Sequence, residues 1–289
     1  MKFLRNLKRA FVYSLPETLW AEYLVAFLYY FVNIRKFPNL KTPKNFNEKT
    51  LWRRLNEREI DYAKYVDKYE VRKHIEKTIG NDCLVPVIGV YENAEEIDFN
   101  SLPNKFIIKT THGSGGNIVC IDKSNFNWVE AKNKVKEYLK TSYYRQTREF
   151  GYKNIKPRVI CEELLEDNII DYKFFCYDGE PKFIEIDTNR YTGHLRSFYK
   201  ANWEEVKNAK MTYPNIPSNM LEKPSQYDKM LEICRILSAE FNFVRVDLYH
   251  TNNKIYFGEL TFFHTGGVEK IIPEEFNIEL AKPLKLKMS

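Results

Sequence analysis

Several patterns that mark common protein classes are missing from this chain. Its five cysteines, at positions 83, 120, 161, 176 and 234, form no Cys-x-x-Cys pair, so the chain offers no zinc-finger spacing. Their odd number is typical of reduced thiols, and three of them lie in apolar strand-like runs, where a free cysteine is usually a small buried side chain. Cysteine usage therefore favours a cytoplasmic location.

A long hydrophobic run is also missing. The most apolar stretch covers residues 23–34, whereas a helix that spans a bilayer needs about 20 apolar residues. Pro16, Glu17 and Glu22 interrupt the sequence just before this stretch. We therefore expect an aromatic helix packed on the main domain. Peripheral docking of that helix on a membrane surface is the alternative.

Charge of one sign is not concentrated in any block. The chain has 45 Lys and Arg against 39 Asp and Glu, with the cations scattered among the acids, and its formal net charge is +6. This balance favours an anionic ligand only weakly. No basic arm, aromatic RNA-binding signature or other nucleic-acid module is present, so nucleic acid is not predicted as a partner. With 289 residues and 44% hydrophobic composition, the chain can bury one large core or two closely packed ones.

The most informative stretch is a glycine-rich loop between two short β-branched runs. Residues 105–109 lead into the loop, residues 118–121 lead out of it, and the loop itself is Gly113-Ser114-Gly115-Gly116. Both flanking runs read as strands, so we expect a hairpin, unlike the strand-to-helix phosphate loops of other nucleotide-binding proteins. Glycine lets backbone N–H groups approach an anion closely, and Lys109 adds a point charge. The pattern predicts a flap over nucleotide phosphates; an ordinary surface hairpin is the alternative.

The remaining elements follow from periodicity and turn signals. Residues 1–60 are predicted to form a helical extension in which Asn47 caps a helix, and Gly80 is predicted to end the next helix. Asp178-Gly179 predicts a tight hairpin turn. Residues 141–157 and 191–223 are expected to be loops, and Ser225 is expected to cap a helix that runs to about residue 241. The expected domains are 1–60, 61–162 and 163–289.

Two carboxylates lie in apolar strand-like runs near the C-terminus. Asp247 is flanked by residues 244–249 and Glu259 by residues 256–261. Buried acids cost free energy unless they bind something, and two opposed carboxylates suit Mg²⁺ that carries substrate phosphates. Five loop residues between the strands would place the acids opposite each other, whereas a two-residue loop would separate them. A cross-strand salt bridge with Arg245 is the alternative interpretation.

Several ordered motifs together resemble the TupA-like ATP-grasp family, which is linked to teichuronopeptide and capsular polysaccharide biosynthesis in bacteria. The motifs are Phe46-Asn-Glu-Lys49, Asp67-Lys-Tyr-Glu-Val-Arg72, His112-Gly-Ser-Gly-Gly-Asn117, Asn154-Ile-Lys-Pro157 and Asp171-Tyr-Lys-Phe-Phe175, followed by Asp247 and Glu259. The resemblance covers roughly residues 40–270. It implies an α+β ATP-grasp fold in which two α+β subdomains clasp a nucleotide, preceded by the helical extension.

The resemblance also implies roles for individual residues. Lys68, Lys109 and the loop from His112 to Gly116 would contact ATP phosphates; Glu162, Glu163 and Leu165 would bind adenine from a connector; Asp171 would accept from a ribose hydroxyl. The remaining positions implied are Lys173 at a phosphate, Arg190 near the transferred phosphoryl group, and Asp247, Glu259 and Thr261 as metal ligands. Thr261 departs from the family pattern, which has asparagine there.

The activity implied is an ATP- and Mg²⁺-dependent carboxylate–amine ligase that acts through an acyl phosphate. Its expected substrates are an amino acid or amine and a uronic acid of a cell-surface polysaccharide. The alternatives are a sugar or polysaccharide kinase on the same fold, and a glycosyltransferase-like or non-catalytic capsule protein. The candidate acceptor surface is Tyr144, Arg145, Arg148, Tyr191, His194 and Arg196.

Overall fold

The computed structural model describes residues 10–166, 169–190 and 192–288. The chain mixes helices with antiparallel sheets, as expected of an α+β protein. Its internal contacts separate two compact units. Unit 1 contains the described residues within 1–25, 58–74 and 84–167, and unit 2 contains those within 26–57, 75–83 and 168–289.

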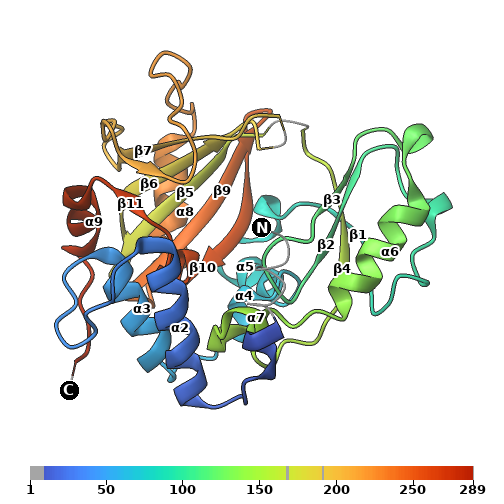
Figure 1. The fold of residues 1–289 in the computed structure, drawn as a ribbon. Helices are drawn as coiled ribbons and strands as arrows, with labels where there is room; N and C mark the ends of the chain where they lie inside the picture. The colour runs from blue at the N-terminus through green and yellow to red at the C-terminus, as the bar shows by residue number, and fades with distance from the viewer. Residues whose placement is uncertain (1–9, 167–168, 191, 289) are drawn as a thin grey trace. The chain divides into compact units, whose positions relative to one another are not determined.

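Unit 1 is built on a four-stranded antiparallel sheet. Its strands, in spatial order, are β1 (Val87–Tyr91), β4 (Val159–Glu163), β2 (Phe106–Thr110) and β3 (Ile118–Cys120). Strands β2 and β3 pair with Phe106 opposite Cys120 and Ile108 opposite Ile118, which confirms the predicted glycine-rich hairpin. Asn127 caps helix α6 (Trp128–Leu139), because its side chain accepts from Glu130 N–H. The helix lies against this sheet (Figure 1) and contributes Val135 to the core of unit 1.

Short helices complete unit 1 and correct one expectation. These are α4 (Ala63–Val66), α7 (Tyr143–Thr147) and the 3₁₀ turns η2 (Phe99–Ser101), η3 (Lys123–Asn125) and η4 (Phe150–Tyr152). The prediction of a loop over 141–157 is wrong. Ser142 caps α7 by accepting from Arg145 N–H, and Arg148, in the left-handed region, ends it. Tertiary burial of this polar segment is the reason that local composition misled.

Unit 2 is built on a five-stranded antiparallel sheet. In spatial order its strands are β10 (Lys254–Thr261), β9 (Phe243–Thr251), β5 (Asp171–Tyr177), β6 (Glu180–Thr188) and β7 (Leu195–Lys200). The Asp178-Gly179 turn between β5 and β6 is confirmed, with both residues at positive φ. Strand β7 lies within 191–223, where a loop-rich segment was expected; its pairing with β6 decides its structure.

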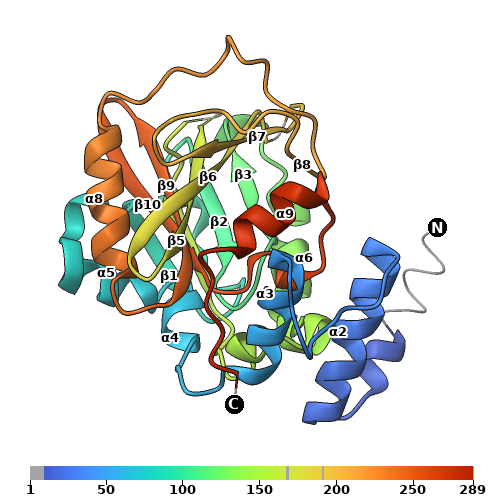
Figure 2. The same cartoon turned by 90° about the vertical axis from the view of Figure 1, so that its left-hand side faces the viewer.

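The sheet of unit 2 is covered on both faces. Helix α8 (Tyr227–Ser238) packs on one face, where Phe174 contacts Tyr227, and helices α3 (Phe46–Asn56) and α9 (Glu274–Ala281) pack on the other, where Phe175 contacts Phe46 (Figure 2). Adjacent residues of a strand point to opposite faces, so Phe174 packs under α8 while Phe175 packs under α3. Burial of such a ring stabilises the fold by roughly 1.5–3 kcal/mol.

The helix caps partly follow the sequence. Helix α5 (Val71–Ile79) ends at Gly80, which has φ 85°, as predicted. Helix α3 is capped by Asn45, which accepts from Glu48 N–H, so the assignment of the cap to Asn47 is wrong. Asn47 is buried inside the helix and donates to the carbonyls of Gly267 and Glu269. Ser225 is likewise not the cap of α8, which begins after Gln226 without a side-chain cap.

The last elements surround the sheet of unit 2 or precede it in the chain. They are α2 (Leu19–Ile34), η1 (Asn81–Cys83), β8 (Lys210–Met211), η5 (His264–Gly267) and β11 (Ile271–Ile272). Strands β8 and β11 form a small separate antiparallel sheet. Among the residues described, none of the helices has the length and apolarity needed to cross a membrane.

Candidate functional site

The glycine-rich loop of unit 1 lines a pocket of about 520 Å³. Its lining includes His112, the loop Gly113–Gly116 and residues from α6 and α7. Gly115 and Gly116 have φ of 81° and 73°, in the left-handed region that favours glycine, and a Cβ on Gly116 would lie 3.1 Å from Thr110 Oγ1. The loop therefore needs its glycines, and its backbone N–H groups remain the candidate anion ligands.

Three cations cluster near this hairpin. Lys68 donates to the carbonyl of Gly113, at the start of the loop. Lys109 Nζ lies 2.7 Å from Glu162 Oε2, and Arg72 Nη1 lies 3.1 Å from Glu162 Oε1. One buried carboxylate thus pairs with two cations, and the three groups together carry a net positive charge. Sequence reasoning quoted Arg72 within a motif but assigned it no role; its i and i+4 spacing from Lys68 was the available signal.

The predicted adenine connector is only partly a connector. Glu162 and Glu163 lie in strand β4, where Glu162 pairs with Ile107 and contacts the two cations, and Leu165 follows in the irregular segment. The expectation that Glu162 belongs to a connector is therefore corrected: its strand pairing extends further than composition indicated. His112 is buried and its Nε2 lies 3.0 Å from Thr141 O. Burial lowers the pKa of His112, which keeps the ring neutral near pH 7.

In unit 2, three neighbouring strands, β9, β5 and β6, bring acids and bases into one buried cluster. Lys173 of β5 pairs with Asp247 of β9, and Asp171 of β5 pairs with Asp187 of β6. The Lys173 ammonium contacts Asp171 and lies 3.3 Å from Asp247 Oδ2 and 3.7 Å from Asp187 Oδ2. Arg190 Nη1 lies 2.9 Å from Asp171 Oδ2. The structure therefore brings together Asp171, Lys173, Arg190 and Asp247, all predicted as site residues.

A β-bulge places Glu259 opposite Asp247. The turn between β9 and β10 has only two residues, Asn252 and Asn253, a length expected to place the acids on opposite faces. The register shifts between Phe257 and Glu259, so Gly258 is the extra residue and Glu259 pairs with Asp247. A Cβ on Gly258 would lie 3.1 Å from Asp247 O and 3.2 Å from the Tyr249 ring. The bulge therefore places the two carboxylates opposite each other, which the two-residue turn alone would have prevented.

Arg245 binds both acids of this pair. Its guanidinium donates to Asp247 Oδ1 at 2.7 Å, to Asp247 Oδ2 at 2.6 Å and to Glu259 Oε1 at 2.7 Å. Thr261 Oγ1 donates to Glu259 Oε1 at 3.0 Å. The salt bridge considered as the alternative from the sequence is therefore present.

The carboxylate oxygens of Asp247 and Glu259 are the type of ligand that divalent cations such as Mg²⁺ bind. Two carboxylates on adjacent strands suit Mg²⁺, which is commonly held by one or two carboxylates together with substrate phosphates. In addition, Asp171 Oδ1 is buried and makes no hydrogen bond within the described part of the chain. No group of three or more His, Cys, Asp or Glu among the described residues is arranged to hold a metal, so a cation here would rely on phosphate and water ligands.

Burial shifts the protonation of this cluster. It raises the pKa of Asp247 to about 6 against the lowering effect of Arg245 and Lys173, and it raises the pKa of Glu185 to about 7 against Arg196. Burial opposes ionisation of Asp187 too, but hydrogen bonds from Arg196 and the charge of Lys173 hold its pKa below the usual range. Sequence reasoning missed Glu185 and Asp187 as members because their alternation with Ile184 and Ile186 predicts the solvent-facing side of a strand, whereas both acids are buried.

Two residues of the predicted acceptor surface are buried in unit 1. Tyr144 is buried and donates to Glu22 Oε1 at 2.8 Å, and Arg148 is buried and donates to the carbonyls of Val12, Leu15 and Pro16. These two assignments are corrected: both side chains hold the chain's early segment in unit 1. Arg145 is exposed, with its Nε 3.5 Å from Glu17 Oε1.

The other acceptor candidates belong to unit 2. Arg196 is buried and donates two hydrogen bonds to Asp187, at 2.7 and 2.9 Å. The expectation that Arg196 lies on an exposed acceptor surface is therefore corrected. His194 stacks on Tyr213 with 3.6 Å between ring centroids. Tyr191 lies outside the described residues.

A glycine-rich hairpin on an antiparallel sheet, and a second antiparallel sheet with acids on adjacent strands, are features of the ATP-grasp class of α+β proteins. Within that class, the chain belongs to the TupA-like ATP-grasp family, whose family model matches residues 48–285.

Solved structures with a similar fold are distant in sequence. D-alanine–D-alanine ligase from Bacillus anthracis complexed with ATP is 13% identical, with 69% of this chain and 55% of that chain covered and a TM-score of 0.42. L-amino acid ligase from Bacillus licheniformis is 13% identical, with 71% and 44% covered and a TM-score of 0.44. D-alanine–D-alanine ligase from Helicobacter pylori is 14% identical, with 77% and 62% covered and a TM-score of 0.41.

This chain spans about half the length of the first two of these ligases. A search of curated protein sequences found no match to it.

Proposed function

We propose that the protein is an ATP- and Mg²⁺-dependent carboxylate–amine ligase that joins an amino acid or amine to a uronic acid of a cell-surface polysaccharide or its precursor. Membership of an ATP-grasp family supports the use of ATP. The observation that carries the proposal is the Asp247–Glu259 pair, which a bulge aligns beside a buried lysine and a buried arginine. Buried acids and bases in contact are characteristic of sites that handle charged substrates.

In the proposed reaction, an acceptor carboxylate oxygen attacks the γ-phosphorus of ATP, and ADP leaves. The amine nitrogen then attacks the acyl carbon, the carbon–oxygen bond to phosphate breaks, and the products are an amide, phosphate and a proton. Bound Mg²⁺ supplies neutralisation of phosphate charge. The chain's own groups position the substrates and shield the acyl phosphate from water. No protein nucleophile is required.

The residues divide these tasks as follows in the proposal. Lys109, Lys68 and the backbone of Gly113–Gly116 bind phosphate oxygens, with Glu162 holding Lys109 in place until ligand arrives. Asp247 and Glu259 hold Mg²⁺, with Thr261 hydrogen-bonded to Glu259. Lys173 and Arg190, both in contact with Asp171, stabilise charge on the transferred phosphoryl group.

The test is incubation of the purified protein with ATP, Mg²⁺, an amino acid mixture and galacturonate or glucuronate oligosaccharides. The ligase predicts ADP together with an amide product that mass spectrometry detects. A phosphorylated sugar would instead establish the kinase alternative, and absence of ADP formation with every acceptor would refute catalysis by this route. Omission of Mg²⁺ should abolish turnover.

We also propose a cytoplasmic location with peripheral contact to a membrane. Trp20, Leu24 and Phe31 follow the spacing of one helical face on α2, and each is more than a third exposed. Flotation with anionic vesicles checks this: wild-type protein should rise with the vesicles, and W20S/L24S should remain below. Equal flotation of both proteins would contradict it.

A further inference from the structure

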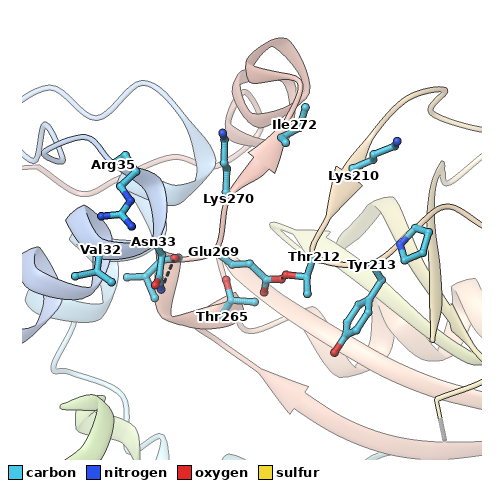
Figure 3. A pocket seen from close by; sticks show the side chains of 12 residues that line it. Val32, Asn33, Arg35, Lys210, Thr212, Tyr213, Thr265, Glu269, Lys270 and Ile272 are labelled. Carbon is cyan, nitrogen blue, oxygen red and sulfur yellow. Dashed lines mark hydrogen bonds between the residues drawn. The ribbon is translucent and has the colours of Figure 1, made fainter. Parts of the chain in front are cut away.

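A second pocket lies within unit 2, and none of the residues assigned above to ATP or metal lines it. Its volume is about 970 Å³ (Figure 3). The walls come from the end of α2, from β8 and the turn after it, from η5, and from the residues leading into β11. An inorganic ion would fill a small part of such a volume, since a water molecule occupies about 30 Å³ in the liquid.

The pocket carries an excess of positive charge. Arg35, Lys210 and Lys270 line it and are exposed, and none of the three forms an ion pair with any described residue. One acid, Glu269, lines it as well, but it accepts from Thr212 Oγ1 and lies 4.0 Å from Arg196 Nη1. The three cations are therefore available to a ligand, while the charge of Glu269 is partly balanced by Arg196.

Strand register explains why the two lysines share the pocket. β8 and β11 pair antiparallel with Met211 opposite Ile271 and Lys210 opposite Ile272. Met211 and Ile271 are buried in the core, so Lys210 and Lys270, each adjacent to one of them in sequence, are directed away from it. Arg35, the residue directly after α2, lines the same pocket (Figure 3).

Three residues that line this pocket have a left-handed backbone. Arg35, Thr212 and Thr265 line it with φ of 63°, 59° and 50°, a region that side-chain-bearing residues rarely adopt and that is least favourable for β-branched threonine. Such residues cluster at ligand sites, where the surrounding structure holds them in place. Thr265 Oγ1 is also buried without a hydrogen-bond partner among the described residues.

Tyr213 connects the pocket to the buried charged cluster. Its ring lines the pocket, stacks on His194 and lies under the Arg196 guanidinium, 4.9 Å from the ring centroid. His194 Nε2 and Arg196 Nε both contact Asp187, which lies beside Lys173. A ligand in this pocket would therefore lie against a wall fixed by the proposed catalytic cluster.

We propose that this pocket binds the acidic acceptor, an oligosaccharide that carries more than one carboxylate. Cations supplied by three separate elements suit a ligand with several separated negative charges, and Asn33, Thr212 and Tyr213 offer hydrogen bonds to sugar hydroxyls. The assignment to a carboxylate acceptor rests on the proposed ligase function; the anion specificity of the pocket does not.

Calorimetric titration with tetragalacturonate tests the pocket directly, without ATP. K210A/K270A should bind at least about tenfold more weakly than wild type, because two charge contacts are lost, and binding should weaken with salt because these contacts are exposed to solvent. The matched control is K207A/K282A, which removes two exposed lysines of the same unit outside the pocket. Equal binding by both double variants would overturn the proposal.

Two further probes fix the class of ligand. Maltotetraose, which lacks charge, should not bind. Tripolyphosphate should bind more weakly than tetragalacturonate; if it binds more tightly and loses binding in K210A/K270A, the pocket is a phosphate site and the saccharide assignment is refuted.

The failure of this proposal can be told from failure of the proposed function. Amide and ADP formation that K210A/K270A leaves unchanged in KM would keep the ligase and refute the pocket. Charge-dependent binding of tetragalacturonate, with no ADP formed from any acceptor, would keep the pocket as an acidic-saccharide site and refute the ligase.

Discussion

The charged clusters of the two units differ in how deeply they are built into the fold. In unit 1, Glu162 joins Lys109 and Arg72, whose side chains remain 19% and 18% exposed. In unit 2, Lys173, Arg245 and Asp187 are exposed by 6%, 9% and 1%, and each contacts more than one charged group. The first cluster can exchange a partner for a ligand at small cost, whereas the second is also part of the core.

The largest effect expected is on turnover, from Glu259, the most accessible acid of the charged cluster in unit 2. Glu259→Gln should lower ATP turnover by roughly 100-fold or more, about 3 kcal/mol, because a charged ligand for Mg²⁺ is lost. The Glu259 side chain is 45% exposed, so the variant should fold. Steady-state ADP release measures this, with Glu240→Gln, an exposed acid of the same unit, as control. Wild-type turnover in Glu259→Gln would refute the metal assignment.

A matched lysine pair tests the difference in burial. Lys173→Met should lower the free energy of unfolding by about 3–5 kcal/mol, because it leaves Asp171 and Asp247 buried with a partner removed. Lys109→Met should cost about 1 kcal/mol or less, since its site is partly solvated, while weakening ATP binding. Urea unfolding and nucleotide titration of both variants give the comparison, and equal stability losses would contradict it.

The bulge in unit 2 gives a smaller effect on stability. Gly258→Ala should destabilise the protein by about 1–3 kcal/mol, because the new methyl group would press on Asp247 O and the Tyr249 ring. Thermal unfolding measures the loss. The control is Gly80→Ala: Gly80 has a positive φ, but a Cβ added there would meet nothing within 4 Å, so this variant reports backbone strain without crowding. A smaller loss in Gly258→Ala than in Gly80→Ala would show that the bulge tolerates a side chain.

The smallest effect expected is a change in pH dependence. Burial raises the pKa of Glu185 to about 7 from an ordinary value of 4.5, so between these values the folded state binds more protons than the unfolded state. Stability from this group is therefore greatest at low pH and declines as pH rises toward 7. Glu185→Gln should flatten that decline between pH 4.5 and 7 in a series of urea unfolding experiments. An unchanged slope would show that Glu185 ionises normally.

Local signals in the sequence were sufficient for the elements whose conformation depends on a few neighbouring residues. The glycine-rich hairpin, the Asp178-Gly179 turn and the helix end at Gly80 are confirmed because positive φ and β-branched runs act within a few residues. The ordered motifs likewise gave the family. The alternation of a strand identified Asp247 and Glu259 as acids in apolar surroundings, but not their partner.

Only the tertiary structure decided which side chains meet. The Gly258 bulge overrode the two-residue turn and aligned the acids, Arg245 occupied them, and burial removed Tyr144 and Arg148 from the expected acceptor surface. The basic pocket is assembled from three segments far apart in the chain, within residues 32–35, 210–214 and 265–272. Strand register and burial are set by contacts between residues far apart in the chain, and no local pattern encodes them. Backbone conformation at turns and helix ends depends on neighbouring residues, so the amino-acid sequence alone could determine it.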